Sequence, residues 1–391
     1  MAIFKDTTLG EVLTLQRGFD ITKKEQTLGS VPIVSSSGIS SFHNESKVKG
    51  PGVIIGRKGT LGTSHFIKQD FWPHDTTLWV KDFKGNDPRF ISYYLKSLKL
   101  ENFDTGSSNP TLNRNHLHKI KIVFPELKIQ KKIAAIISCY DDAIEANKNK
   151  ISTLENIVEE IYKEWFVRFR FPDFKNTEFK KTIPKGWDVV KLNSIAIENS
   201  KSTKAGDHLK KRKYLPLDVM GAKSFLPIGH YGYDKALSSL VTFEKGEFIF
   251  GAMRPYQHKV NLAPFDGITR TTCFVIKPKE EWLYSYLYLT LYKQSTIDFA
   301  MLISNGSDRP YTVWKKGFER MGVLKPSKDI LILFENRVRP ILNNIASYYD
   351  FQHNLEEIKR SLLPRLISGK LSVDKLDIQF PPSMLEKNEV N

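Results

Sequence analysis

The chain has 391 residues, of which 40% are hydrophobic and 12% aromatic, a composition that excludes a largely disordered protein. Lysine and arginine outnumber aspartate and glutamate by 59 to 43, and the net charge of +16 favours a polyanionic partner, above all nucleic acid. Two cysteines, Cys139 and Cys273, are too few for a disulfide framework or a four-thiolate zinc site, and without a signal peptide or a membrane-length apolar run we expect a cytoplasmic protein.

The first third of the chain predicts a small mixed α/β domain. An apolar strand at 52–56 runs into a loop rich in glycine and cations, and an amphipathic helix follows at 90–95. A Gly-Ser loop at 106–112 then leads to a strand at 120–125 that ends in proline. We place the first domain at residues 1–125.

A long helix is predicted at 126–167, because apolar residues recur at alternating spacings of four and three over nearly five heptads. Such a seam is typical of a helix that pairs with another helix. Its single polar member, Asn147, would fix the register of that pairing. The predicted seam consists of Ile133, Ile137, Tyr140, Ile144, Asn147, Ile151, Leu154, Val158 and Ile161.

The same series of elements recurs in the second half of the chain. A strand ending at Gly251, a helix at 282–287, a Gly-Ser loop at 305–311 and a strand ending at Pro326 appear in the same order as before. A second seam follows, with Gln352 as its polar interruption. Its residues are Val338, Ile341, Ile345, Tyr348, Leu355 and Leu362. The predicted segments are a linker at 168–184, a second domain at 185–327, a second long helix at 328–372 and a polar tail at 373–391, which we expect to be poorly ordered.

The ordered set of motifs resembles the specificity (S) subunit of type I restriction-modification systems. The segments that carry this resemblance are 165–172, 183–187, 250–256 and 363–370. The resemblance implies an α+β fold with two similar target-recognition domains, separated by two long helices that form an antiparallel coiled coil with a pseudo-two-fold internal repeat. It also implies a non-catalytic subunit that reads a bipartite target in double-stranded DNA.

Partners and cofactors are also implied by the resemblance. We expect two methyltransferase subunits and restriction-translocase subunits to assemble with this chain, and no membrane partner. Adenine-N6 methylation and DNA cleavage would then take place on those partners, which would bind S-adenosylmethionine, ATP and magnesium. The chain itself is expected to hold no metal and no cofactor.

DNA contacts are expected from the glycine loop and the Gly-Ser loop of each domain, because base reading needs donors and acceptors on loops and cations hold phosphates. In the first domain the candidates are Arg57, Lys58, Thr60, Ser107, Ser108, Asn109 and Arg114. In the second domain they are Arg254, Tyr256, His258, Lys259, Ser307, Asp308 and Arg309. A lysine-rich run at 201–213 is a candidate for backbone contacts only.

Two other functions are open at this point. A coiled-coil scaffold with non-specific nucleic-acid binding would show no sequence preference. A metal-dependent nuclease would use Asp173, Glu178 and Lys180, but these residues lie too close together in a charged linker to supply carboxylates from adjacent strands. His116 and His118 lack an evident third ligand, and no P-loop or adenine-methyltransferase motif is present.

Overall fold

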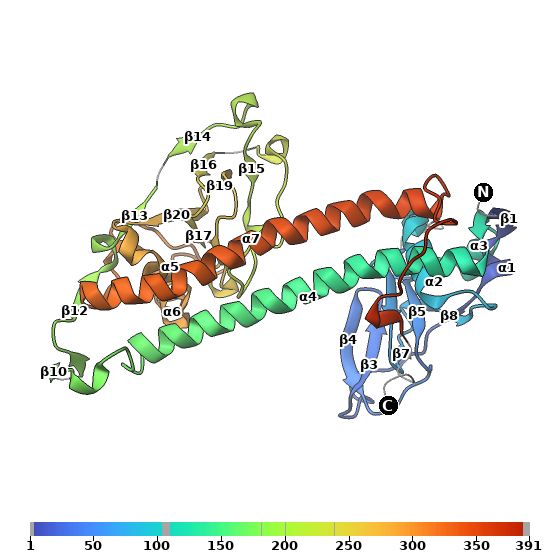
Figure 1. The fold of residues 1–391 in the computed structure, drawn as a ribbon, viewed down its shortest axis with the longest axis horizontal. Helices are drawn as coiled ribbons and strands as arrows, with labels where there is room; N and C mark the ends of the chain where they lie inside the picture. The colour runs from blue at the N-terminus through green and yellow to red at the C-terminus, as the bar shows by residue number, and fades with distance from the viewer. Residues whose placement is uncertain (1–3, 104–109, 181, 200, 238, 386–391) are drawn as a thin grey trace. The chain divides into compact units, whose positions relative to one another are not determined.

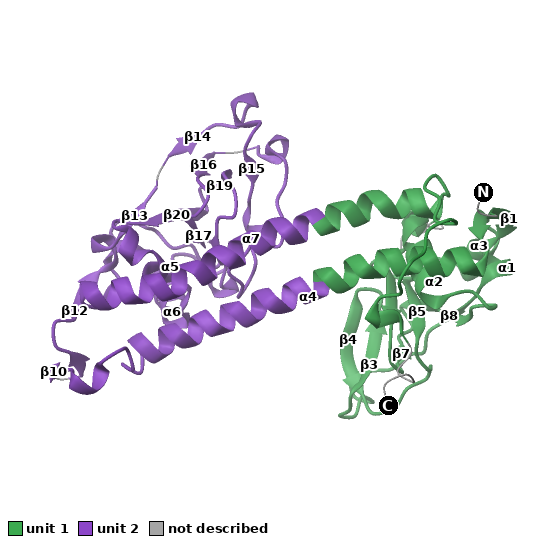
Figure 2. Ribbon diagram, viewed as in Figure 1, with its two compact units in different colours: residues 1–144, 355–391 green, residues 145–354 purple. Residues whose placement is uncertain are grey.

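The structure is a computed structural model. The residues that it describes are 4–103, 110–180, 182–199, 201–237 and 239–385. The chain forms two compact units (Figure 2): unit 1 contains residues 1–144 and 355–391, and unit 2 contains residues 145–354. Each unit includes a part of both long helices, which the sequence predicts at 126–167 and 328–372. The structure places these helices at α4 (Leu127–Phe166) and α7 (Lys328–Ile367).

Unit 1 contains three sheets and short helices (Figure 1). Its elements before α4 are β1 (Phe4–Thr8), α1 (Leu9–Val12), β2 (Thr14–Arg17), β3 (Val31–Ser35), β4 (Gly38–His43), β5 (Gly52–Gly56), β6 (Ser64–Ile67), β7 (Trp72–Pro73), β8 (Thr77–Asp82), α2 (Pro88–Ser97), α3 (Arg114–His118) and β9 (Lys121–Pro125).

The central sheet of unit 1 has the strand order β2-β8-β5-β6, with all neighbours antiparallel. Strand β5 is buried along its whole length, which explains its continuous apolar sequence. Helix α2 packs on β5 and β6 and begins at Pro88 after the N-cap Asp87, whose carboxylate accepts a hydrogen bond from the Phe90 amide (2.7 Å). A second sheet has the order β4-β3-β7, and β1 pairs with β9.

Unit 2 contains the second set of strands and helices. Its elements between α4 and α7 are β10 (Phe179–Lys180), β11 (Ile183–Pro184), β12 (Asp188–Lys191), β13 (Ala196–Glu198), β14 (Ser202–Thr203), β15 (Lys213–Tyr214), β16 (Leu240–Phe243), β17 (Phe248–Gly251), β18 (Val260–Leu262), β19 (Gly267–Arg270), β20 (Cys273–Pro278), α5 (Tyr284–Tyr292), α6 (Gln294–Leu302) and β21 (Gly322–Lys325).

The central sheet of unit 2 repeats the strand order of unit 1, whereas the second sheet of unit 2 has the order β14-β16-β19-β15. The central sheet is β13-β20-β17-β18, so β13, β20, β17 and β18 take the places of β2, β8, β5 and β6. The pair β12–β21 corresponds to β1–β9. Helix α5 packs on its central sheet at β18 and β20, and α2 packs on its own central sheet at β5 and β6. The predicted fold class, two similar mixed α/β domains with two long helices, is therefore confirmed.

The two long helices contact each other within each unit. In unit 2 the ring centroids of Phe166 and Phe334 lie 4.7 Å apart, and the side-chain amide of Asn147 donates to the carbonyl oxygen of Tyr348 (3.1 Å). In unit 1 Lys359 of α7 forms an ion pair with Asp141 of α4. Residues late in α4 thus meet residues early in α7, so the helices pair antiparallel.

The polar interruptions of the two seams meet each other. The Asn147 amide nitrogen lies 3.4 Å from Oε1 of Gln352, and Asn147 is only 3% exposed. The predicted seam residues are all buried or half-buried. Asn147 and Gln352 therefore have the partner that a register-fixing amide needs.

The C-terminal segment packs on unit 1, where we had expected a poorly ordered tail. The ammonium group of Lys132 donates to the carbonyl oxygens of Val373 (3.3 Å), Asp374 (2.7 Å) and Leu376 (2.7 Å). Arg89 donates to the hydroxyl (2.8 Å) and the carbonyl oxygen (2.7 Å) of Ser383. Val373 is buried in the same hydrophobic cluster as residues of α2 and β5. These contacts hold the described part of the tail, residues 373–385.

Candidate nucleic-acid interface

In unit 1 the glycine loop after β5 lies against the segment that precedes α3. The Leu112 amide donates to the carbonyl oxygen of Arg57 (3.0 Å), and Lys58 forms a β-bridge with Thr111. The two loops that the sequence predicts to bind DNA are therefore neighbours. Of their candidate residues, Ser107, Ser108 and Asn109 lie outside the described residues.

The glycines of this loop are required by its backbone. A Cβ atom on Gly56 would lie 2.0 Å from the Thr60 carbonyl oxygen, and Gly62 has a φ of +71°. The Gly62 amide closes the turn by donating to the Gly56 carbonyl oxygen (3.0 Å). The turn leaves the side chains of Lys58 and Thr60 exposed.

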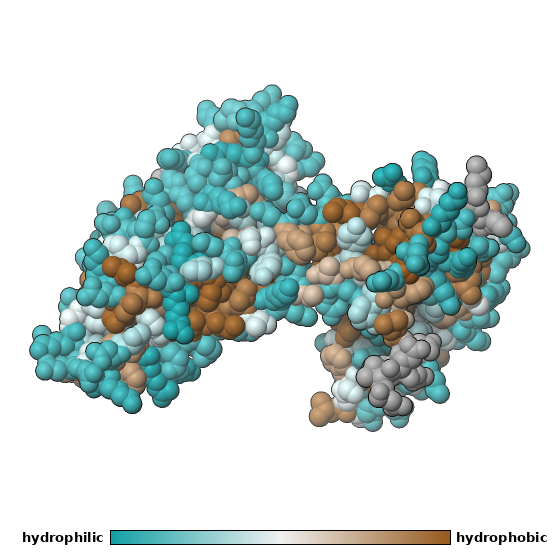
Figure 3. All heavy atoms as spheres, viewed as in Figure 1, coloured by the Kyte–Doolittle hydropathy of each residue, from teal (hydrophilic) through white to brown (hydrophobic). Residues whose placement is uncertain are grey.

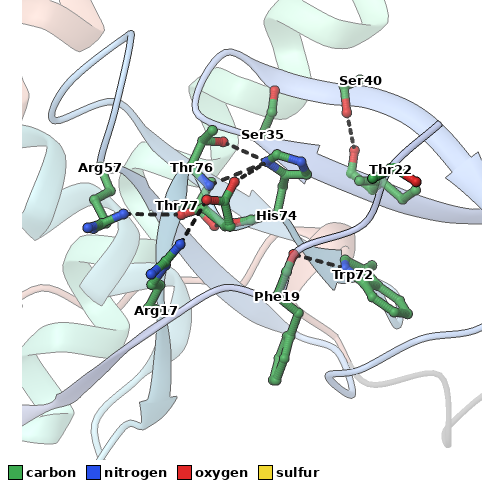
Figure 4. Close-up of polar contacts among 12 residues, drawn as sticks. Arg17, Phe19, Thr22, Ser35, Ser40, Arg57, Trp72, His74, Thr76 and Thr77 are labelled. Atoms are coloured by element: carbon green, nitrogen blue, oxygen red, sulfur yellow. Dashed lines mark hydrogen bonds and ion pairs between the residues drawn. The ribbon is translucent and has the colours of Figure 1, made fainter. Parts of the chain in front are cut away.

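Arg17 is a cation of this surface that the sequence analysis missed. It ends β2, and its guanidinium donates to the carboxylate of Asp75 (2.9 Å). The Nη1 atom of Arg57 lies 3.5 Å from the backbone carbonyl oxygen of Asp75, so both arginines contact the turn that contains Asp75 (Figure 4). Pairing of β2 with β8 brings Arg17 there, and nothing in the local sequence signals that pairing.

In unit 2 the same two segments meet through equivalent hydrogen bonds. The Thr312 amide donates to the Ala252 carbonyl oxygen (2.9 Å), and Met253 forms a β-bridge with Tyr311. Arg254 has a left-handed backbone (φ 52°), and its amide donates to the Pro310 carbonyl oxygen (2.7 Å). The exposed candidate residues beside this contact are Tyr256, Ser307, Asp308 and Arg309.

Two candidate residues of unit 2 are engaged inside the unit. His258 is 6% exposed, and its Nε2 lies 2.7 Å from the Tyr292 carbonyl oxygen. Burial lowers the pKa of His258, which favours the neutral ring. The ammonium of Lys259 donates to the Leu217 carbonyl oxygen (2.5 Å). Both side chains therefore contribute to the packing beneath the loop.

Strand pairing gives a residue-by-residue correspondence between the two glycine loops. Gly56 pairs with Thr77 in unit 1 as Gly251 pairs with Cys273 in unit 2. Counting onward from these glycines, Arg57 corresponds to Ala252 and Gly59 to Arg254. The sequence comparison had matched the two loops by their cations, but the structure shows that the cations occupy different positions.

The lysine-rich run at 201–213 is partly engaged within unit 2. Arg212 forms an ion pair with Glu244 (2.8 Å), and Lys213 lies 4.9 Å from the centroid of the Phe265 ring. The exposed members of the run are Lys201, Lys204, Lys210 and Lys211. Only these four present their charge freely to a polyanion.

The side chains that resemble catalytic or metal-binding motifs have structural partners. The Asp173 carboxylate accepts from the Asn176 amide (2.6 Å), and Glu178 forms an ion pair with Lys185 (2.6 Å). The His118 ring accepts a hydrogen bond from the Leu15 amide (2.9 Å). These contacts give the residues a role in local packing.

A single group in the described part of the chain has metal-ligand geometry, formed by Asp20, His74 and Asp75. Its Asp75 carboxylate is paired with Arg17, and the His74 ring lies 3.1 Å from the Thr76 hydroxyl (Figure 4). A cation would have to displace the arginine. We assign no metal to this group.

The surface in Figure 3 is mostly hydrophilic, with hydrophobic residues gathered over the long helices. Within the described residues, no helix has the length and apolar character needed to cross a lipid bilayer. Paired loops that present cations and polar side chains, found once in each unit, have the chemistry that contacts with DNA require.

Comparison with known proteins shows what the chain is similar to. Residues 3–156 match the family described as type I restriction modification DNA specificity domain. The chain is 27% identical to the type I restriction enzyme MjaIX specificity subunit of Methanocaldococcus jannaschii, covering 73% of this chain and 69% of that protein. It is 21% identical to the HindI specificity subunit of Haemophilus influenzae, covering 67% and 71%.

A solved structure shares the fold. The crystal structure of the type I restriction-modification system S subunit from M. genitalium matches with a TM-score of 0.65 at 15% identity, covering 94% of this chain and 96% of that one. The predicted resemblance to type I specificity subunits is confirmed by these matches.

Proposed function

We propose that this chain reads a bipartite DNA target, with one half-site bound by each unit, and that it directs adenine-N6 methylation and cleavage by partner subunits. The observation that carries this proposal is the pair of hydrogen-bonded loops that occurs once in each unit. The hydrogen bond from Leu112 to Arg57 in unit 1 and that from Thr312 to Ala252 in unit 2 join the same two loops at the same strand end. Two copies of this pair of loops, with different side chains, suit two half-sites of different sequence.

The partners in this proposal are two methyltransferase subunits and restriction-translocase subunits, which act with this chain in the cytoplasm. Those partners supply S-adenosylmethionine, ATP and magnesium, and this chain supplies sequence recognition. Two linked readers multiply specificity, because both half-sites must be engaged at the same time.

The test is co-purification of the chain with the methyltransferase encoded beside it, followed by methylation mapping of cellular DNA. The proposal predicts a stable complex and a two-part motif with one methyladenine on each strand. A complex that methylates an undivided motif would contradict bipartite reading. Binding without any sequence preference would favour the scaffold instead.

A further inference from the structure

A cavity of about 340 Å³ lies in unit 1 between the glycine loop and the start of α3. Three arginines from separate elements line it: Arg17 at the end of β2, Arg57 after β5 and Arg114 at the start of α3. The remaining lining residues are Leu78, Thr111, Leu112 and Asn113. Among the described residues that line the cavity, three carry positive charge and none is a carboxylate.

The charge of this cavity is only partly compensated. Asp75 neutralises Arg17 through the ion pair at 2.9 Å, which leaves the charges of Arg57 and Arg114. Burial and the unfavourable interaction with the positive charge of Arg17 lower the pKa of Arg57, and the carboxylate of Asp75 opposes this effect. An anion between the guanidinium groups would remove that unfavourable interaction.

The equivalent position in unit 2 shows that the fold does not need an arginine at the place of Arg114. Leu112 in unit 1 and Thr312 in unit 2 donate equivalent hydrogen bonds. Two residues further along the chain, Arg114 therefore corresponds to Trp314. Trp314 is 8% exposed, and its ring centroid lies 5.6 Å from that of Phe274. Unit 2 therefore fills with apolar side chains the place that unit 1 lines with cations.

We infer that the cavity of Arg17, Arg57 and Arg114 binds a phosphate of the DNA backbone. This inference rests on the proposed function, because it names the group of the DNA that unit 1 holds. Phosphate oxygens accept the forked hydrogen bonds of guanidinium groups and carry the negative charge that would balance Arg57 and Arg114. A base would bring no charge, and the cavity offers no aromatic ring on which a base could stack. The phosphate contact would set the register of unit 1 on its half-site.

The experiment measures binding of the full-length chain to a duplex of random sequence over a range of salt concentrations. Arg114→Ala is the main variant, because its side chain is exposed and its loss leaves the fold intact, which an unchanged melting temperature would verify. We expect the affinity to fall about three- to tenfold and the slope of log K against log salt to decrease by about 0.9, as for the loss of one phosphate contact. Lys81→Ala is the control, because it removes an exposed positive charge of unit 1 outside the cavity.

Arg17→Lys provides a second variant that keeps the charge but loses the fork, and we expect a smaller loss of affinity. The methylated motif should stay the same in each variant. An Arg114→Ala protein that binds like the Lys81→Ala control would overturn the inference, as would an altered base preference with an unchanged salt slope. If the unaltered chain binds no duplex at any salt concentration, the proposed function itself fails, and the inference fails with it.

Discussion

Residue Arg254 combines two features that seldom occur together. Its backbone is left-handed, a conformation that costs an ordinary side chain roughly 1 kcal/mol or more, and its Nε is buried without a hydrogen-bond partner among the described residues. The equivalent position in unit 1 is Gly59, with φ +76°. The protein thus keeps a strained arginine where the repeat shows that glycine suffices, which suggests that the side chain acts on DNA.

Replacing Arg254 tests this interpretation at one position. Arg254→Gly should keep or slightly raise the free energy of unfolding, because glycine adopts the left-handed conformation without strain. The same variant should lose recognition of one half-site only, as read from the methylation motif of the complex. Arg254→Ala serves as the comparison, since it lacks the side chain but retains the strain. Loss of recognition at both half-sites would show that Arg254 makes no base-specific contact.

His230 gives unit 2 a pH dependence. Its Nδ1 lies 2.9 Å from the hydroxyl of Tyr349, and burial together with the positive charges of Lys213 and His353 lowers its pKa from 6.5 to about 4, against the opposing effect of Asp350. The unfolded chain binds the proton more readily. Stability from neutral His230 is therefore complete above the unfolded pKa and is lost as the pH falls toward the folded pKa.

We expect the free energy of unfolding to decrease as the pH falls from about 6.5 to about 4, and His230→Gln should remove this component. Urea unfolding at a series of pH values would measure both proteins. Because other groups also titrate in this range, the informative quantity is the difference between the two curves. Parallel curves would contradict a role for His230.

At the scale of elements, the register of α4 against α7 depends on one amide in an apolar seam. Asn147 donates to Tyr348, but its own Oδ1 is buried without a partner among the described residues. A buried unsatisfied oxygen lowers stability, so Asn147 supports specific pairing at a cost in free energy.

Asn147→Leu should therefore raise the free energy of unfolding by about 1 kcal/mol, because it fills the seam and removes the unsatisfied oxygen. Asn147→Asp has nearly the same volume but buries a charge, and it should lower the stability instead. Urea unfolding of both variants measures these effects. A leucine variant less stable than the natural chain would show that the amide stabilises the pair.

Several elements could be predicted from the sequence because their signals are local. The alternation of spacings in α4, the glycine at the end of β5 and the proline at the end of β9 each follow from a short stretch of chain. The position of Arg17 could not be predicted, because it depends on which strand pairs with β2. Glu155 was missed for the same reason: it lies beside the seam, yet it accepts a hydrogen bond from the amide of Phe225 (2.7 Å) and is 9% exposed.

At the scale of the whole molecule, the proposed function makes the long helices a determinant of target spacing. Inserting one heptad after Ile151 in α4, with a matching heptad after Ser347 in α7, keeps the seam in phase. The added length of about 10 Å corresponds to about three base pairs, by which the unspecified gap of the target should widen. An insertion of three residues in each helix is the control, because it puts the seam out of phase. Methylation mapping that finds the original gap after the full insertion would refute this role.

The contacts of Lys132 and Arg89 with the last described residues have a consequence for biosynthesis. Unit 2 is one continuous stretch of chain, whereas unit 1 is built from both ends, with Leu366 and Val373 buried in its core. During translation the ribosome adds residues 355–391 after all residues of unit 2. Unit 1 begins to be synthesised first, but it cannot complete its core until its C-terminal residues have been made after those of unit 2.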